Sequence, residues 1–93
     1  MRYMNVIYLD GYLRNKVRLG LYTYFTLYDP IKKQSFTCKT RSRYIKHIGS
    51  EHIIGIRGSL ESSGISKIIN VEEIKVYGVE EWKHMLYIMV INL

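Results

Sequence analysis

The sequence has one cysteine, Cys38, and one proline, Pro30, in 93 residues. A single cysteine excludes an internal disulfide and a cysteine-rich zinc site, and it is compatible with a reducing compartment. No stretch approaches the roughly 20 apolar residues that a membrane-spanning helix requires. The first twelve residues, MRYMNVIYLDGY, also lack the uninterrupted apolar core of a signal peptide. We therefore expect one small domain in a cytoplasmic protein.

Acidic residues are scarce in the first half of the chain. Positions 1–50 hold ten Lys and Arg against two Asp, a net charge of +8, whereas positions 51–93 hold four Lys and Arg against six Glu, a net charge of −2. Between Gly11 and Ser50 the only acid is Asp29. This asymmetry favours a polyanionic partner, although a basic soluble protein without such a partner stays an alternative. The basic residues do not follow an amphipathic helix, which argues against binding to a membrane.

Residues that commonly carry catalysis are also sparse. The three histidines, His47, His52 and His84, are scattered and lack a carboxylate or cysteine at metal-ligand spacing. The chain has no G-x-x-x-x-G-K-[ST] phosphate loop. No pair of carboxylates in the basic half is placed to hold a catalytic magnesium ion. We therefore expect a protein that is not an enzyme and that needs no metal or cofactor.

Alternation of apolar and polar residues predicts five strands. They run from about Tyr3 to Arg14, Gly20 to Asp29, Gln34 to Arg41, His52 to Leu60 and Lys67 to Tyr77. Residues 15–20 are expected to form a basic connection, and residues 42–48 a short helix that Ser42 caps. We expect a bend or bulge at Gly11, and a bulge near Glu72 and Glu73 that returns the following residues to the core.

The segment GLYTYFTLYD, positions 20–29, concentrates aromatic residues in one strand. Successive side chains of a strand point to opposite faces. The face expected in the core carries Leu21, Thr23, Phe25 and Leu27, and the other face carries Tyr22, Tyr24, Thr26 and Tyr28. Elsewhere, the residues expected in the core are Ile7, Leu9, Leu13, Phe36, Cys38, Tyr44, Ile45, Ile48, Ile54, Ile56, Leu60, Ile69, Val71, Ile74 and Val76.

Three segments in this order resemble OB-fold domains. VIYLDGYL resembles the first OB strand with its mid-strand glycine, YFTLYD the second, and IIGIRGSL followed by INVEEIKV the closing hairpin. The resemblance covers Val6 to about Tyr77. It is close to bacterial single-stranded DNA-binding proteins, anticodon-binding domains and the N-terminal domain of the exonuclease VII large subunit. It implies an all-β domain at residues 1–78, with minor α structure: a five-stranded Greek-key barrel with a short helix between strands three and four.

The resemblance implies a binding site for single strands on the outer face of the second and third strands. Tyrosines would stack on bases and basic side chains would follow phosphates, with little sequence specificity. The implied partner is single-stranded DNA, or RNA, and the implied process is replication, recombination or repair. The predicted nucleic-acid-binding residues are Tyr8, Tyr12, Arg14, Lys16, Arg18, Tyr22, Tyr24, Tyr28, Lys39, Arg41, Arg43 and Lys46. Two alternatives stay open: the tyrosines serve sheet packing, or the domain is a protein-interaction module.

Residues 79–93 form an apolar extension beyond the barrel. Trp82, Met85, Leu86, Met89 and Val90 fall at helical spacing, although the run MLYIMVINL also fits a strand. Apolar residues on more than one side of such a segment favour packing on the barrel or an oligomer interface, and we predict these five residues for that interface. Its partner would be a second copy of the chain or a replication or recombination protein.

Overall fold

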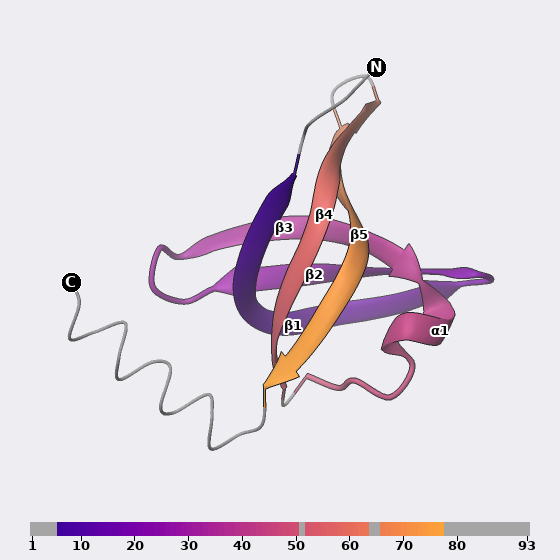
Figure 1. The fold of residues 1–93 in the computed structure, drawn as a ribbon, viewed down its shortest axis with the longest axis horizontal. Helices are drawn as coiled ribbons and strands as arrows, with labels where there is room; N and C mark the ends of the chain where they lie inside the picture. The colour runs from indigo at the N-terminus through magenta and orange to yellow at the C-terminus, as the bar shows by residue number, and fades with distance from the viewer. Residues whose placement is uncertain (1–5, 51, 64–65, 78–93) are drawn as a thin grey trace.

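The computed structural model describes residues 6–50, 52–63 and 66–77 (Figure 1). The elements are β1 (Ile7–Leu19), β2 (Tyr22–Asp29), β3 (Gln34–Arg41), α1 (Ser42–Ile45), β4 (Ile53–Ser63) and β5 (Ser66–Tyr77). The strands close into a barrel in the order β1-β2-β3-β5-β4. The predicted fold class is confirmed: an all-β, five-stranded barrel with a short helix between β3 and β4. The extension at residues 79–93, with its predicted interface residues, lies outside the described residues.

Strand β1 is long and strongly curved, and it pairs with two neighbours (Figure 1). Its residues 7–12 pair antiparallel with β4, and its residues 12–19 pair antiparallel with β2. Gly11 lies at the change of partner, where a Cβ atom would overlap the carbonyl oxygen of Tyr28. The predicted bend is therefore present, because a residue without a side chain lets the two backbones approach this closely.

The predicted connection at residues 15–20 is wrong, because β1 continues through it to Leu19. Between Arg14 and Val17 the register shifts, so that Asn15 and Lys16 lie opposite a single residue of β2. Asn15 adopts a positive φ of 51°, a conformation that asparagine tolerates better than most residues. The chain then reverses at Gly20, with a φ of 66°. This bulge, which we call the β1 bulge, keeps the strand paired to its end.

The core lies inside the barrel, and α1 adds to it. Its buried members are Leu13, Phe25, Leu27, Cys38, Ile45, Ile48, Ile54, Ile56, Ile69 and Val71. In β5 the predicted bulge is confirmed: Arg57 pairs with Glu73 and Gly58 with Val71, which leaves Glu72 as the extra residue. The bulge returns Ile74 to the edge of the core.

Four residues predicted for the core are exposed instead: Leu21, Tyr44, Leu60 and Val76. Leu21 lies in the β1–β2 turn, outside the barrel. Tyr44 lies on the outer side of a helix of only one turn. Leu60 lies beyond the last pairing of β4 with β1, and Val76 well beyond the last pairing of β5 with β3. Alternation therefore predicts burial only where a strand has neighbours that enclose its inner face.

Ser42 does not cap the helix as predicted. The N-cap residue is Arg41, which makes no side-chain cap hydrogen bond. Ser42 is buried, and its hydroxyl lies 2.8 Å from the Thr23 hydroxyl and 3.0 Å from the carbonyl oxygen of Gly20. It joins the start of α1 to the β1–β2 hairpin. No helix within the described ranges is long and apolar enough to cross a bilayer.

Leu27 and Leu21 provide a matched test of this burial pattern, because the sequence predicts both for the core. Leu27 is 0% exposed and Leu21 is 76% exposed. We expect Leu27→Ala to lower the free energy of unfolding by about 2–5 kcal/mol, through lost burial and a cavity. Leu21→Ala should change it by less than about 0.5 kcal/mol. Urea denaturation measures the free energy of unfolding of both variants. Similar losses would contradict the burial of Leu27 and the exposure of Leu21.

Candidate nucleic-acid interface

Strands β1, β2 and β3 present a continuous outer face, which we call the platform. Residues directly opposite one another in antiparallel strands share a face. The platform therefore consists of four cross-strand rows: Tyr12–Tyr28–Ser35, Arg14–Thr26–Thr37, Val17–Tyr24–Lys39 and Leu19–Tyr22–Arg41. The predicted tyrosine row on β2 lies along its middle, and the third strand supplies the predicted cations beside it.

One end of the platform carries two stacked rings. The rings of Tyr12 and Tyr28 have centroids 6.5 Å apart and planes 21° apart. The guanidinium carbon of Arg14 lies 4.6 Å from the centroid of the Tyr12 ring. Tyr12 thus extends the tyrosine row onto β1, as predicted. Arg14 adds a cation beside the stacked pair.

The other end of the platform surrounds Tyr22 with cations. Lys39 Nζ lies 5.0 Å from the centroid of the Tyr22 ring, and the guanidinium carbon of Arg41 lies 6.0 Å from it. Lys39 Nζ also lies 3.4 Å from a carboxylate oxygen of Glu61, which reaches the platform from β4. This ion pair is partly exposed, so it stabilises the fold by less than about 1 kcal/mol and leaves Lys39 able to exchange partners.

The β1 bulge separates three basic residues, Arg14, Lys16 and Arg18, that are all predicted to bind nucleic acid. Arg14 precedes the bulge and lies on the platform. Lys16 turns toward α1, where its ammonium group donates to the carbonyl oxygens of Ile45 at 3.2 Å and Ile48 at 2.6 Å. Arg18 pairs with the inward-facing Thr23, on the side of the strand away from the platform. Lys16 therefore connects β1 to the end of α1 and to the residues that follow it.

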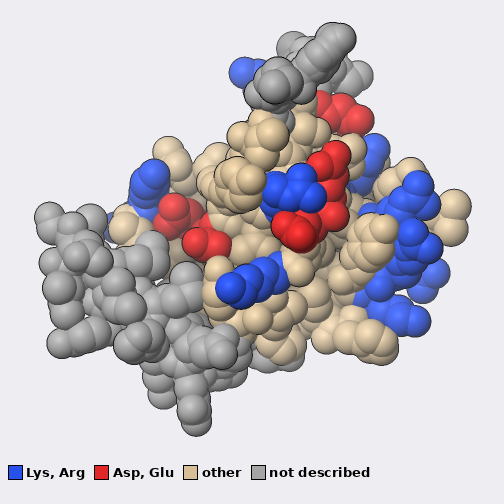
Figure 2. All heavy atoms as spheres, viewed as in Figure 1, with Lys and Arg blue, Asp and Glu red and all other residues tan. Residues whose placement is uncertain are grey.

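Three further predicted residues, Arg18, Arg43 and Lys46, meet Arg41 at one end of the platform. Together with Leu21 and Ser42 they line a pocket of about 240 Å³, which we call the basic pocket. Figure 2 shows the corresponding concentration of Lys and Arg atoms at the right of the molecule, over α1 and the β1–β2 hairpin.

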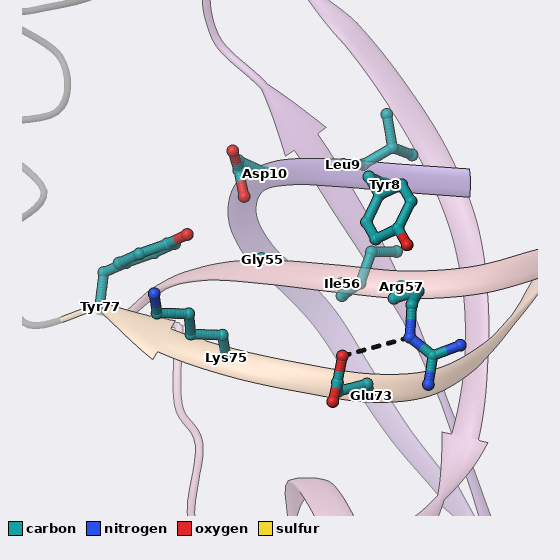
Figure 3. Close-up of a pocket in the computed structure, with 9 residues that line it drawn as sticks. All are labelled: Tyr8, Leu9, Asp10, Gly55, Ile56, Arg57, Glu73, Lys75 and Tyr77. Carbon is teal, nitrogen blue, oxygen red and sulfur yellow. Dashed lines mark hydrogen bonds and ion pairs between the residues drawn. The ribbon is translucent and has the colours of Figure 1, made fainter. Parts of the chain in front are cut away.

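Tyr8, also predicted for the interface, lies elsewhere. It belongs to the part of β1 that pairs with β4, and it lines a second pocket of about 310 Å³ with Asp10, Arg57, Lys75 and Tyr77, among others (Figure 3). Arg57 pairs there with Glu72 at 3.1 Å and Glu73 at 3.2 Å. Acids and bases thus alternate on this face, unlike on the platform strands.

Asp10 shows the electrostatic character of the second pocket. Burial raises the pKa of its carboxyl group, and the charge of nearby Lys75 opposes that rise. Gly55 forms the floor between Asp10 and Tyr77, where a Cβ atom would meet the side chains of both. The pocket is therefore narrow and mixed in charge.

Among the described residues, possible metal ligands are not clustered, and the thiol of Cys38 is buried. No three His, Cys, Asp or Glu side chains in residues 6–50, 52–63 and 66–77 are grouped to hold a metal ion. Cys38 is buried in the core, and burial raises the pKa of its thiol to about 12. The thiol therefore stays protonated and unreactive at neutral pH.

The sequence matches no family model and no curated protein sequence. Solved structures match its fold. A replication protein A heterotrimer bound to single-stranded DNA has a TM-score of 0.70 at 14% identity, covering 91% of this chain and 69% of the other. The Stn1–Ten1 complex of S. pombe has a TM-score of 0.70 at 12% identity, covering 90% and 68%. Asparaginyl-tRNA synthetase from Pyrococcus horikoshii has a TM-score of 0.64 at 15% identity, covering 76% and 19%.

The chain has an OB-fold. The predicted resemblance is confirmed by these neighbours together with the closed five-stranded barrel and the helix between β3 and β4. Sequence identities of 12–15% establish the fold alone. In this OB-fold the platform occupies the face of β2 and β3 that the resemblance implied.

Sequence reasoning missed two platform residues, Val17 and Leu19. Both are apolar and more than half exposed. The β1 bulge moves them onto the platform beside Tyr24 and Tyr22, whereas uninterrupted alternation places them on the opposite face. The one available signal was Asn15, a residue type that tolerates the positive φ of such a bulge.

Lys16 and Arg14 test the different roles that the bulge assigns to them. Lys16→Met should lower the free energy of unfolding by about 1–2 kcal/mol, because two charge-assisted hydrogen bonds to the carbonyl oxygens of Ile45 and Ile48 are lost. Arg14→Met removes the contact with the half-buried Tyr12 ring and should lower the free energy of unfolding by less than about 1 kcal/mol. Urea denaturation of both variants measures the difference, and a larger loss for Arg14→Met would contradict the assignment.

Asp10 gives a pH-dependent prediction. Its pKa is raised in the folded protein, so its ionised form is disfavoured and the wild type loses stability as pH rises from about 3.8 through that raised value. Asp10→Asn should therefore be more stable than the wild type at pH 7. The difference should vanish near pH 3.5, where both side chains are neutral. Thermal unfolding at the two pH values measures it, and a less stable variant at pH 7 would contradict the burial effect.

Proposed function

We propose that the protein binds single-stranded nucleic acid, DNA in preference to RNA, across the platform, without catalysis and with little sequence specificity. The observation that carries the proposal is the registered alternation of tyrosine rings with cations. Tyr22 lies in a row with Arg41, and Tyr24 in a row with Lys39. Every base has a π face whatever its identity, so this arrangement holds a strand without reading its sequence.

Stacking and charge contribute separately to this binding. Each base stacked on an aromatic ring contributes about 1–3 kcal/mol. Arg14, Lys39 and Arg41 lie beside the rings and would contact phosphates, which releases counterions and makes the affinity depend on salt. Among the described residues of β1, β2 and β3, the acids are Asp10 and Asp29, and neither belongs to the four rows of the platform. A phosphate backbone on this face therefore meets cations without a competing carboxylate from the same strands.

The fold comparisons support this class of function. One structural neighbour is a replication protein A heterotrimer solved with single-stranded DNA. A role in replication, recombination or repair follows from the same proposal, because single-stranded DNA arises in those processes.

A protein-interaction role is the second candidate, and one observation favours it. Leu19 and Leu21 at the β1–β2 hairpin are 63% and 76% exposed, beside the half-exposed Val17. Exposed apolar side chains in one patch are typical of protein interfaces. A second structural neighbour is the Stn1–Ten1 complex. In this candidate the domain joins a larger assembly through its hairpin.

Fluorescence anisotropy of a labelled dT oligonucleotide tests the first candidate. We expect Tyr22→Ala/Tyr24→Ala to weaken binding by at least about 30-fold, which corresponds to about 1 kcal/mol or more for each lost stack. Wild-type affinity should fall steeply between low salt and about 0.2 M salt. An rU oligonucleotide of equal length should bind more weakly than the dT oligonucleotide.

Tyr8→Ala is the matched control. Tyr8 is 72% exposed but lies off the platform, so its loss should leave binding within about twofold. A folded wild type that binds no oligonucleotide, or equal effects of the control and the double variant, would contradict the platform. The first of these outcomes favours the protein-interaction role.

A further inference from the structure

The basic pocket brings together four cations from separate parts of the chain. Arg18 comes from β1, Arg41 from the end of β3, Arg43 from α1, and Lys46 from the residue after α1. All four side chains are exposed. The pocket has a volume of about 240 Å³ and opens at the end of the molecule where Figure 2 shows a concentration of basic atoms.

The floor of this pocket is built by hydrogen bonds. The backbone amide of Ser42 donates to the carbonyl oxygen of Leu21 at 2.8 Å, and its buried hydroxyl lies between Thr23 and Gly20. The Nε–H group of Arg18 donates to the carbonyl oxygen of Gly20 at 3.1 Å. These bonds hold the hairpin against the start of α1, so the cations converge on a fixed floor.

The pocket gathers positive charge without a carboxylate to neutralise it. Among the described residues, none of the four cations forms an ion pair with Asp or Glu. Neighbouring Tyr44 responds to this charge: a hydrogen bond from Arg43 lowers the pKa of its phenol, and the charges of Arg43 and Arg41 lower it further. Repulsion among like charges disfavours this arrangement unless an anion enters it.

The pocket is continuous with the platform. Arg41 lines the pocket and also ends the platform row that contains Tyr22. Arg41 therefore borders both surfaces, so a strand on the platform ends beside the pocket if it runs past Tyr22 toward Arg41. At the opposite end of β2, the chain turns at Asp29 and Pro30, where Asp29 accepts hydrogen bonds from the backbone amides of Ile31 and Lys32. The two ends of the platform thus differ: four cations converge at the basic pocket, whereas Asp29 lies beside Lys32 and Lys33 in the β2–β3 turn.

Two kinds of phosphate differ in the charge that they would bring to the pocket. A phosphodiester inside a strand carries one negative charge. A terminal phosphate monoester carries about 1.5 to 2 negative charges at pH 7, with a second pKa near 6, and three acceptor oxygens. Three arginine guanidinium groups and one ammonium group supply more donors than a diester accepts. We propose that the basic pocket binds the terminal phosphate monoester of a single strand whose bases lie on the platform. This inference rests on the proposed function.

Anisotropy with three labelled dT oligonucleotides of equal length tests the proposal: one without a terminal phosphate, one with a 5′-phosphate and one with a 3′-phosphate. We expect one phosphorylated form to bind at least about tenfold more tightly than the unphosphorylated form, which also reveals which strand end enters the pocket. An unphosphorylated oligonucleotide one nucleotide longer controls for the added charge. The preference should shrink between pH 7.5 and pH 5.5, as the monoester loses its second charge.

Two variants locate the effect. Arg43→Gln/Lys46→Gln should reduce the preference to less than twofold. Lys32→Gln/Lys33→Gln removes two charges from the β2–β3 turn, away from the pocket, and should leave the preference intact. Equal binding of all three oligonucleotides by the wild type would overturn the inference. If that binding still falls steeply with salt, the proposed function stands without it.

Binding of inorganic phosphate to the basic pocket can be measured directly, even if no oligonucleotide binds. Inorganic phosphate should shift the backbone amide resonances of residues 41–46 in a proton–nitrogen correlation spectrum, and chloride at matched ionic strength should not. Arg43→Gln/Lys46→Gln should abolish these shifts while the rest of the spectrum is retained. If inorganic phosphate causes no such shifts in the wild type, the inference that the basic pocket binds phosphate is overturned.

Discussion

The close approach of β1 to Tyr28 at Gly11 is the contact on which the rest of the structure depends. One strand must serve two neighbours, β4 over its first half and β2 over its second, if five strands are to close a barrel. The change of partner requires a sharp bend, and a Cβ atom at Gly11 would overlap the carbonyl oxygen of Tyr28. A residue without a side chain therefore allows β2 to lie against β1. The platform exists only because those two strands and β3 then share one outer face.

The β1 bulge determines where three basic side chains of β1 lie. It inserts one residue between Arg14 and Val17, and from there to Leu19 the two sides of the strand are exchanged. Arg14 stays on the platform, Lys16 binds the carbonyl oxygens of Ile45 and Ile48, and Arg18 joins the basic pocket. A single backbone irregularity thus divides one basic segment into three roles: a contact with a ring, a structural hydrogen bond and a wall of the pocket.

The two outer faces of the barrel differ in their chemistry although tyrosines occur on both. On the platform, cations lie over rings, and the carboxylate of Glu61, which contacts Lys39, comes from β4. On the face with Tyr8 and Tyr77, Arg57 is paired with two glutamates and the pocket has a partly buried aspartate. The charges of the first face would attract an anionic strand, whereas the second face presents carboxylates that would repel it. The neighbouring charges, rather than the tyrosines, distinguish the two surfaces.

Strand periodicity and glycine positions, which are local properties of the chain, predicted the order of the elements, the bend at Gly11, the bulge near Glu72 and the tyrosine row of β2. The resemblance of three segments to OB-fold domains predicted the barrel. Tertiary structure decided the rest. Tyr8 and Tyr12 share a parity, yet the curvature of β1 takes them to different neighbours. Leu21, Leu60 and Val76 fit the core pattern, yet all three are exposed. Arg18, Arg41, Arg43 and Lys46 meet in one pocket because the β1 bulge and the bonds of Ser42 join three elements. These side-chain positions depend on the register of the strands and on closure of the barrel. Register and closure follow from contacts between residues far apart in the chain.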